Sequence, residues 1–330
     1  MNRQSLSTME VDCDLCHKHS TVNLYTSQDY LHGCPGQWPV VQCKDCGLSF
    51  TNPRPTPETL TEYYPQDYCP YQFKTEKRFG LRHRLQRWAF HYHWNYPPIK
   101  SNKLGKLFSY PIWRWAKTNK RNYNLFPYQG DGRLLDFGCG NGQYLSYMAK
   151  LGWHVHGMDM STLAVETCQA KGLQAVAGIR PDQTYAPEYF DVVTLWHVLE
   201  HVPSPTETLQ HIHTVLKPGG KLIVAVPNID STLSHSLKQY WYFLDVPRHL
   251  THFTPETLNM VLNKSGYRLE CLKKQDHGGG LYKSLNFINE TQAKRKFAWL
   301  AHHKLLCRKV QKVINFVGKP DVIIAHAIRI

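Results

Sequence analysis

The sequence predicts an α/β protein in which a parallel sheet is joined to a small N-terminal module. Two observations predict it. From about residue 132 onward, short apolar runs alternate with stretches of helical periodicity, a pattern typical of strands connected by helices. Residues 1–71 are instead rich in Cys, Pro and Tyr and have few long apolar runs. This first segment therefore needs something other than a hydrophobic core to hold it together.

The alternating region supplies the predicted elements in chain order. Strands are expected at 133–137, 154–158, 173–177, 190–196, 221–227, 267–273 and 321–330. Helices are expected between them at 142–151, 162–171 and 205–216. Strands that alternate with helices in this way predict a parallel sheet covered by helices on both faces.

Composition narrows the class of protein. Of the 330 residues, 42% are hydrophobic and 19% are charged, so the chain can bury a core. No apolar run is long enough to span a bilayer, and the first residues lack the apolar segment of a secretory signal. Ten cysteines in such a chain indicate a reducing compartment, and we expect a cytoplasmic protein.

The positive charge is concentrated in two segments. The formal net charge is +14, and Glu76 is the one acid in the basic and aromatic stretch 72–128. Residues 291–319 contain eight Lys and Arg residues and no acid, while Leu306, Val310, Val313 and neighbouring apolar residues recur at helical spacing. These segments are expected to form basic helices. Three roles stay open for them: packing on the sheet, binding to an anionic membrane surface, or binding to nucleic acid.

Four cysteines form two CxxC pairs. Cys13 and Cys16 precede Cys43 and Cys46 at a spacing that fits a closed tetrahedral zinc ribbon. A metal would stabilise this core-poor segment. The alternatives are a redox pair, or a site that includes residues such as His17, His32 or Cys34. We expect the remaining thiols to be inert and to lie in the core: Cys69, Cys168, Cys271 and Cys307.

A glycine-rich loop follows the first predicted strand. Gly138, Gly140 and Gly142 alternate with Cys139 and Asn141, and an acid, Asp136, precedes them by two residues. Glycines allow a tight turn and close approach of the backbone to a ligand. A dinucleotide fingerprint would have glycine at position 143, where this chain has Gln. Asp159, at the end of the next strand, can accept hydrogen bonds from both hydroxyls of a ribose.

This combination resembles the class I S-adenosylmethionine-dependent methyltransferases over roughly residues 130–330. Further segments that resemble the family, in the same order, are 190–202, the turn 216–221, and 249–258 followed by 264–267. The resemblance implies a Rossmann-like seven-stranded sheet and S-adenosylmethionine as cofactor. The residues that it assigns to the cofactor are Asp136, Gly138, Cys139, Gly140, Gly142, Asp159, Met160, Gly178 and Trp196.

Methyl transfer requires alignment of the acceptor and, for many acceptors, removal of a proton. The candidates are His249, His252, His197, Glu200 and His201, of which we favour the first two. Residues 198–202 resemble the quinone O-methyltransferase branch, where a glutamate stands at the position of His197 and a divalent metal is bound. Residues 249–253 resemble a stretch of zinc-bearing sugar C-methyltransferases. Alternatively, these side chains cap a helix or are polar groups of the core.

Three domains follow from these patterns. We predict a zinc ribbon at 1–71, a basic aromatic helical linker at 72–128, and a methyltransferase domain at 129–330 with a basic amphipathic helical insertion at about 291–319. The ribbon and the methyltransferase body together resemble a bacterial group near polysaccharide, lipid and natural-product pathways. The expected acceptor is therefore a small molecule or a lipid-linked saccharide, and the expected location is the cytoplasm, peripheral on the inner face of the membrane.

Two other functions remain open on sequence grounds. A zinc ribbon also precedes some ribosomal-RNA methyltransferases, so the ribbon and the basic segments could hold RNA. Alternatively, the protein is a binding module that keeps a nucleoside pocket without turnover.

Overall fold

A computed structural model describes residues 7–64, 81–97, 104–118, 125–275, 279–291 and 298–330. Cys69 and residues 292–297 of the basic C-terminal segment lie outside these ranges. The chain forms two compact units. Unit 1 contains residues 1–68, 195–213 and 222–330, and unit 2 contains residues 69–194 and 214–221. The domain boundaries expected from the sequence remain a prediction.

A seven-stranded sheet has the order β12-β13-β10-β9-β6-β7-β8. Its strands are β6 (Arg133–Phe137), β7 (His154–Asp159), β8 (Gln174–Ala177), β9 (Phe190–Trp196), β10 (Leu216–Pro227), β12 (Tyr267–Gln275) and β13 (Val322–Arg329). The sequence predicted all seven, although β10 begins before the expected residue 221. The strands β6, β7 and β8 pair in parallel, which aligns their carboxyl ends.

The sheet is mixed, not wholly parallel as the alternation had suggested. β13 pairs with β12 in antiparallel register, with Tyr267 opposite Arg329 and Gln275 opposite Val322. The reason is topological, because the chain leaves β12 through two long helices and returns to insert β13 between β12 and β10. Cys271 lies on β12 and is exposed, so the expectation that it belongs to the core was wrong.

The helices α4 (Gln143–Leu151), α5 (Thr162–Gln169), α6 (Pro181–Thr184), α7 (Pro205–Val215) and α9 (Pro255–Lys264) follow strands of the sheet or of the ribbon. Two of them begin at side chains that cap the backbone. Ser161 accepts a hydrogen bond from the amide of Ala164, and Thr254 forms a capping box with Thr257. These caps satisfy amide groups that have no partner inside the helix.

In unit 2, the basic aromatic segment forms α2 (Leu81–Trp94) and α3 (Gly105–Thr118), as the periodicity predicted. The two helices pack through aromatic rings. The rings of Trp94 and Trp113 meet edge-on at 6.3 Å, and Nε2 of His93 lies 3.1 Å from the hydroxyl of Ser109.

In unit 1, the N-terminal module contains β1 (Thr8–Met9), β2 (Thr21–Ser27), β3 (Trp38–Cys43), β4 (Ser49–Thr51), β5 (Arg54–Pro55), α1 (Pro57–Leu60) and η1 (Thr61–Tyr63). A short strand from much later in the chain, β11 (Thr251–His252), completes a four-stranded sheet of order β11-β4-β3-β2. Thr251 pairs with Phe50 and His252 with Ser49. The module therefore shares a sheet with the segment that carries the predicted histidines.

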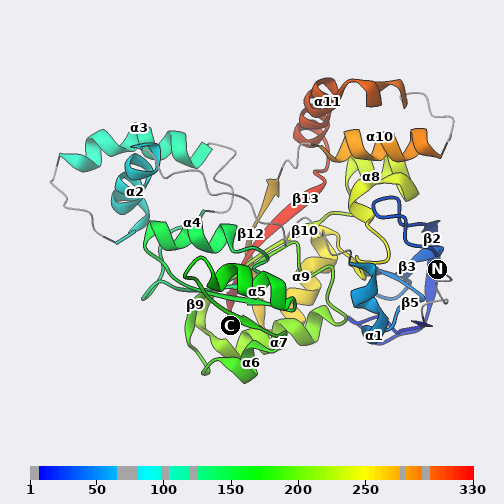
Figure 1. The fold of residues 1–330 in the computed structure, drawn as a ribbon, viewed down its shortest axis with the longest axis horizontal. Coiled ribbons are helices and arrows are strands. Elements are labelled where there is room, and N and C mark those ends of the chain that lie inside the picture. Colours follow the sequence, from blue (N-terminus) through cyan, green and yellow to red (C-terminus); the bar gives the residue numbers. More distant parts are fainter. Residues whose placement is uncertain (1–6, 65–80, 98–103, 119–124, 276–278, 292–297) are drawn as a thin grey trace. The chain divides into compact units, whose positions relative to one another are not determined.

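The C-terminal helices of unit 1 surround a second core. They are α8 (Thr232–Leu237), η4 (Lys238–Tyr240), η5 (Tyr242–Leu244), α10 (Gly280–Glu290), η6 (Ala298–His302) and α11 (Lys304–Val317) (Figure 1). The buried Asp321 accepts hydrogen bonds from the indole of Trp241 and the side chains of Ser231 and Gln311. Within the residues that the structure describes, no helix is both long and apolar enough to cross a membrane.

Candidate active site and metal centre

The glycine loop joins β6 to α4 in unit 2. Gly138, Gly140 and Gly142 all have positive φ, between 52° and 76°. The amides of Gly138 and Cys139 both donate to the carbonyl of Met158, at 2.7 and 3.1 Å, which fixes the loop against the end of β7. A Cβ added at Gly142 would lie 2.7 Å from Sγ of Cys168. The third glycine is therefore required by conformation and by packing.

Two backbone amides hold the carboxylate of Asp159. One carboxylate oxygen accepts the amide of Gly140 at 2.8 Å, and the other accepts the amide of Ser161 at 2.9 Å. Burial raises the pKa of Asp159, although the two amides oppose the shift. Each oxygen can accept further hydrogen bonds, because a carboxylate has about four lone-pair sites. The two amides therefore orient this carboxylate, which can still bind a diol.

Asp136 lies at the end of β6, where its carboxyl group is buried. The hydroxyl of Thr194 on β9 donates to it at 2.7 Å. Burial raises the pKa of Asp136 well above its ordinary value, and the charge of nearby Asp159 adds to the effect. Two carboxyl groups in one small region disfavour simultaneous ionisation, so a ligand with a positive charge or hydroxyl donors would stabilise both.

The other residues predicted for the cofactor lie at strand ends. Met160 follows Asp159 and is exposed, so it offers an apolar surface next to the carboxylate. The amide of Gly178, after β8, donates to the carbonyl of Asp159 at 2.9 Å. Trp196 ends β9 in unit 1. The site thus fits a nucleoside with a ribose diol. It combines the carboxyl ends of the parallel strands β6, β7 and β8, a loop of positive-φ glycines, and an acid held by backbone amides.

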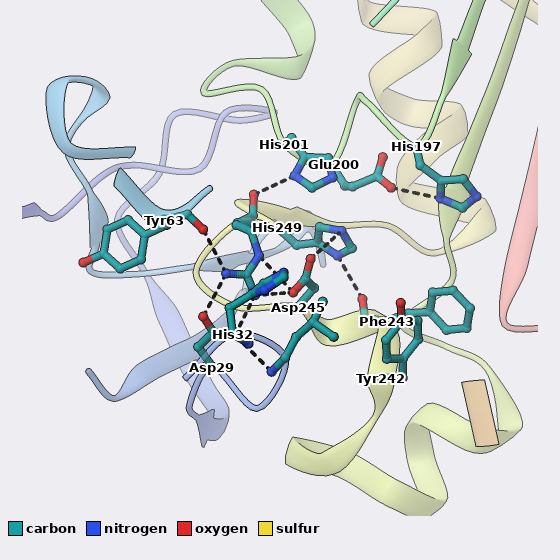
Figure 2. Close-up of polar contacts among 12 residues, drawn as sticks. Asp29, His32, Tyr63, His197, Glu200, His201, Tyr242, Phe243, Asp245 and His249 are labelled. Carbon is teal, nitrogen blue, oxygen red and sulfur yellow. Dashed lines mark hydrogen bonds and ion pairs between the residues drawn. The ribbon is translucent and has the colours of Figure 1, made fainter. Parts of the chain in front are cut away.

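The five predicted acid–base residues form one cluster in unit 1. Nδ1 of His197 lies 3.2 Å from Oε1 of Glu200, and the rings of His201 and His249 meet edge-on at 4.5 Å (Figure 2). Ligand atoms of Glu200, His201 and His249 all lie within 4.8 Å of one another, so these three residues could also hold a metal ion. The ring of His252 is 6.4 Å from that of His249.

Hydrogen bonds to backbone carbonyls orient two of these imidazoles. Nδ1 of His249 lies 2.9 Å from the carbonyl of Phe243, and Nδ1 of His201 lies 3.1 Å from the carbonyl of Arg248 (Figure 2). A carbonyl accepts only from a protonated nitrogen, which favours hydrogen on Nδ1 and a lone pair on Nε2 of His249. Nδ1 of His201 also lies 3.0 Å from the hydroxyl of Tyr64, so this nitrogen has two polar partners. Burial lowers the pKa of both residues, that of His249 especially far. Both rings are therefore neutral at neutral pH and can accept a proton.

His252 has a different environment. Its Nε2 lies 3.2 Å from the hydroxyl of Thr51 on β4, in the sheet that β11 completes. Burial lowers the pKa of His252 to about 3. These contacts favour a role for His252 in joining β11 to the N-terminal module.

A comparison with protein families identifies the domain. Residues 112–272 match the model of a family described as a methyltransferase domain. The chain carries a class I S-adenosylmethionine-dependent methyltransferase domain. The family match begins inside α3, in the segment expected to be a linker.

Curated relatives match over a shorter region. The ubiquinone biosynthesis O-methyltransferase of Colwellia psychrerythraea is 33% identical over 133 residues, which are 38% of this chain and 52% of that protein. The enzyme of the same name from Aeromonas salmonicida is 31% identical over 131 residues, again 38% and 52%. The chain thus spans about half the length of the curated relatives that it matches.

Solved structures with a similar backbone include two S-adenosylmethionine-dependent methyltransferases. The protein from Archaeoglobus fulgidus is 23% identical, with a TM-score of 0.45 and coverage of 66% of this chain and 94% of that one. The protein from Mesorhizobium loti is 17% identical, with a TM-score of 0.44 and coverage of 65% and 100%.

Outside the methyltransferase domain, the four cysteines predicted to bind zinc come together. Sγ of Cys13 lies 3.4 Å from Sγ of Cys46, and Sγ of Cys16 lies 3.4 Å from Sγ of Cys43. All four sulfurs lie within 4.8 Å of one another. A tetrahedron with Zn–S bonds of about 2.3 Å has sulfurs about 3.8 Å apart, so the arrangement fits zinc.

The two cysteine turns have the same backbone. The amide of His17 donates to the carbonyl of Cys13 at 2.7 Å, and the amide of Gly47 donates to the carbonyl of Cys43 at 3.0 Å. Both donors have positive φ. Burial raises the pKa of the Cys46 thiol to about 11, because a buried thiolate needs a counter-charge. A divalent cation among the four sulfurs would supply it.

The first turn also contacts the methyltransferase domain. Asp14, between Cys13 and Cys16, accepts the hydroxyl of Ser204 at 2.5 Å and the amide of Thr206 at 3.0 Å, which caps the beginning of α7. At the end of α9, Lys264 donates to the carbonyl of Leu15 at 2.6 Å. The ribbon is thus fixed to two helices by polar contacts that depend on its folded turn.

An ion-pair cluster that the sequence analysis missed lies beside His249. The fully buried Arg248 donates to both oxygens of Asp29, at 2.6 and 2.8 Å, and to Asp245 at 2.5 Å. It also donates to the carbonyl of Tyr63. Burial alone would raise the pKa of Asp29, but the hydrogen bonds and charge of Arg248 outweigh it and lower the pKa. No sequence signal identifies this pair, because its members are 219 residues apart.

Proposed function

We propose that this protein transfers a methyl group from S-adenosylmethionine to a small-molecule or lipid-linked saccharide acceptor. The observation that carries the proposal is the carboxylate of Asp159, which two amides orient at the end of β7 beside the glycine loop. The membership of residues 112–272 in a methyltransferase family supports it. The activity, the acceptor and the partners of the whole chain are proposals on this basis.

The cofactor would be held by residues of unit 2. Asp159 would accept the ribose hydroxyls, the backbone of the loop from Gly138 to Gly142 would approach the ligand closely, and Met160 would contact the base. When bound, S-adenosylmethionine supplies an electrophilic methyl group on a sulfonium. The residues of this chain would align the acceptor with that methyl group. The high effective molarities of well-oriented intramolecular reactions indicate that such alignment can supply a large part of the rate enhancement.

We propose His249 as the group that takes the proton of the acceptor. Its Nδ1 is committed to the carbonyl of Phe243, so its Nε2 carries the lone pair that a base needs. The low pKa of His249 keeps this lone pair free at neutral pH. His201 and Glu200, whose ligand atoms lie within 4.8 Å, would receive or stabilise the transferred proton. His197 would orient Glu200.

The acceptor class rests on two further features. The curated relatives named above are ubiquinone biosynthesis O-methyltransferases, which favours an acceptor with a hydroxyl group and a lipid tail. The basic helix α11 also leaves much of its apolar surface uncovered. Val313, Phe316 and Val317 are exposed, while Cys307 and Gln311 face the core. We propose that α11 lies on the anionic inner face of a membrane.

Calorimetry with S-adenosylmethionine and S-adenosylhomocysteine tests the cofactor. Asp159→Asn should weaken binding by about 1.5–3 kcal/mol for each ribose hydrogen bond that is lost. Asp131→Asn is a matched control in unit 2, because Asp131 is an exposed acid that pairs with Lys217. Absence of binding by the wild type at millimolar ligand would contradict the proposal.

Turnover tests the base. His249→Asn keeps a donor for the carbonyl of Phe243 but removes the basic nitrogen. It should lower kcat by about 10²–10⁴-fold with hydroxylated quinols or lipid-linked sugars, and leave cofactor affinity unchanged. A normal kcat in this variant would assign the proton transfer to another group.

Co-sedimentation with vesicles tests the location of α11. Binding to anionic vesicles should persist in part at 0.5 M salt and weaken in Val313→Asp, since each exposed cation contributes about 1 kcal/mol at low salt. Binding to RNA without binding to vesicles would favour the RNA methyltransferase instead.

A further inference from the structure

Two buried thiols of unit 2 lie next to each other at the glycine loop. Cys139 belongs to the loop itself, and Cys168 lies on α5. Their Sγ atoms are 3.9 Å apart, although the residues are 29 positions apart in the chain. Neither thiol belongs to the two groups of potential metal ligands that the described residues form. The sequence predicted an inert thiol at Cys168, but the fold gives this sulfur a second sulfur as its neighbour.

Hydrogen bonds connect this pair of thiols to the backbone that orients Asp159. Sγ of Cys168 donates to the carbonyl of Gly140 at 3.3 Å. The amide of the same Gly140 donates to a carboxylate oxygen of Asp159 at 2.8 Å. A Cβ added at Gly142 would lie 2.7 Å from Sγ of Cys168, so this sulfur also packs directly against the loop. A chemical change at Cys168 therefore acts on the loop without an intermediate.

The two sulfurs differ in how readily they lose a proton. The hydrogen bond from the thiol of Cys139 lowers the pKa of Cys168, and the charge of Lys171 adds to the effect, against the opposing effects of burial and Asp159. The same hydrogen bond, together with burial, raises the pKa of Cys139. The thiolate is the nucleophilic form of cysteine, so Cys168 is suited to attack an oxidant and Cys139 to react with the product.

We propose that Cys139 and Cys168 form a reversible disulfide when hydrogen peroxide oxidises them, and that this bond weakens ligand binding at the glycine loop. The sulfur of Cys168 attacks one peroxide oxygen, the O–O bond breaks, and a sulfenic acid forms while the thiol proton leaves in the first water. The sulfur of Cys139 then attacks that of Cys168, the S–O bond breaks, and the second proton leaves in the second water. The two sulfurs together lose two electrons, and the peroxide is reduced to two waters.

The disulfide changes the loop in two ways. The sulfurs approach from 3.9 Å to about 2.05 Å, which draws the side chain of Cys139 towards α5. The oxidised Cys168 also has no proton to donate to the carbonyl of Gly140. Both changes act on the residues next to the amide that orients Asp159. We therefore expect the oxidised loop to bind a nucleoside ligand less tightly, and a reducing thiol to reverse the effect.

Burial of the pair selects a small oxidant. Cys168 is fully buried and Cys139 is 7% exposed, so the approach is through the loop. A ligand bound at the loop would close this approach, and we expect saturating S-adenosylhomocysteine to slow the oxidation.

Formation of the bond does not depend on the proposed methyl transfer, but its effect on affinity rests on the proposed cofactor site. The two are measured separately. Peptide mapping detects the bond, whereas calorimetry on the reduced protein detects the cofactor site. Failure of either is therefore distinguishable from failure of the other.

The test treats the full-length protein with hydrogen peroxide, alkylates the remaining thiols and identifies disulfide-linked peptides by mass spectrometry. We expect a peptide that links Cys139 to Cys168. Affinity for S-adenosylhomocysteine should fall by about tenfold or more, because a binding site tolerates displacements of only about 0.5 Å. Dithiothreitol should restore the affinity. It does not reduce methionine sulfoxide, so restoration excludes oxidation of the exposed Met160 as the cause.

Two variants isolate the pair. Cys168→Ser keeps a hydroxyl donor for the carbonyl of Gly140 but cannot form the bond, so peroxide should leave its affinity unchanged. Cys271→Ser, which removes an exposed thiol of unit 1, is the control and should respond as the wild type does. Zinc release, measured with a chromogenic chelator, reports oxidation of the four-cysteine cluster separately.

Three outcomes would overturn the inference. Absence of the linked peptide under conditions that oxidise Cys271 would mean that the pair does not react. A linked peptide without loss of affinity, in protein whose reduced form binds the ligand, would mean that the loop tolerates the bond. An equal, dithiothreitol-reversible loss of affinity in Cys168→Ser would assign the effect to another thiol.

Discussion

The glycine loop of unit 2 and the Arg248 cluster of unit 1 both bury carboxylates, and they stabilise them by different means. Asp159 is held by backbone amides from residues 19 positions before it and two positions after it. Asp29 is held by a guanidinium 219 positions away, with further amides from its own loop. The first arrangement leaves acceptor capacity for a ligand, and the second uses it within the protein. A buried acid is thus a candidate for binding only when its partners leave lone pairs free.

Loss of zinc from the four-cysteine cluster of unit 1 should have the largest effect on stability. Cys43→Ser removes one of four zinc ligands, and structural zinc in small modules contributes on the order of 10 kcal/mol to their folding. We expect the wild type to contain one zinc per chain and the variant to lose it, as measured by elemental analysis. Cys271→Ser, an exposed thiol on β12, is the control and should retain the metal. Equal zinc in both variants would place the site elsewhere.

Breaking the buried ion pair should come next. Asp29→Asn leaves the charge of Arg248 incompletely paired in the core, so we expect a loss of about 3–5 kcal/mol in the free energy of unfolding by urea. Asp230→Asn removes an acid that pairs with the largely exposed Lys319 in the same unit, and it should cost about 1 kcal/mol or less. Similar costs for the two variants would show that burial of the pair is unimportant.

Alanine substitutions at two glycines separate the cost of overpacking in the loop from the cost of a positive φ. Gly142 and Gly172 have φ of 71° and 72°, but a Cβ at Gly142 would meet Cys168 at 2.7 Å and one at Gly172 would meet nothing within 4 Å. Both alanine variants should lose about 1 kcal/mol from the positive φ. Gly142→Ala should lose a further 1–3 kcal/mol from overpacking and should also bind the cofactor less tightly. Urea unfolding and calorimetry measure the two effects.

The last effect concerns the pH dependence of stability and is absent at neutral pH. The folded protein holds His252 with a pKa of about 3, whereas the unfolded chain has an ordinary value near 6.5. The unfolded state therefore binds one more proton between these values, so this stability is complete above about pH 6.5 and decreases as the pH falls. We expect His252→Gln to reduce the slope of the unfolding free energy against pH by about 1.4 kcal/mol per pH unit between pH 4 and 6.5. Urea unfolding at a series of pH values measures this slope. An unchanged slope would mean that His252 is accessible to protons in the folded state.

The sequence by itself determined the elements and the motifs whose residues lie close together in the chain. The seven strands, the glycine loop with Asp136 and Asp159, and the two cysteine turns were all predicted, because each depends on periodicity, glycine conformation or short spacing. The five acid–base candidates were also found, although their roles remain predictions.

Tertiary structure alone decided how distant segments satisfy one another. It paired β11 with β4, which joined His252 to Thr51, and it placed Arg248 on Asp29. It also reversed β13 against β12. None of these features has a local sequence pattern. A buried ion pair or a strand pairing forms because buried polar groups need partners. These partners are far apart in the chain, and only the folded protein brings them together.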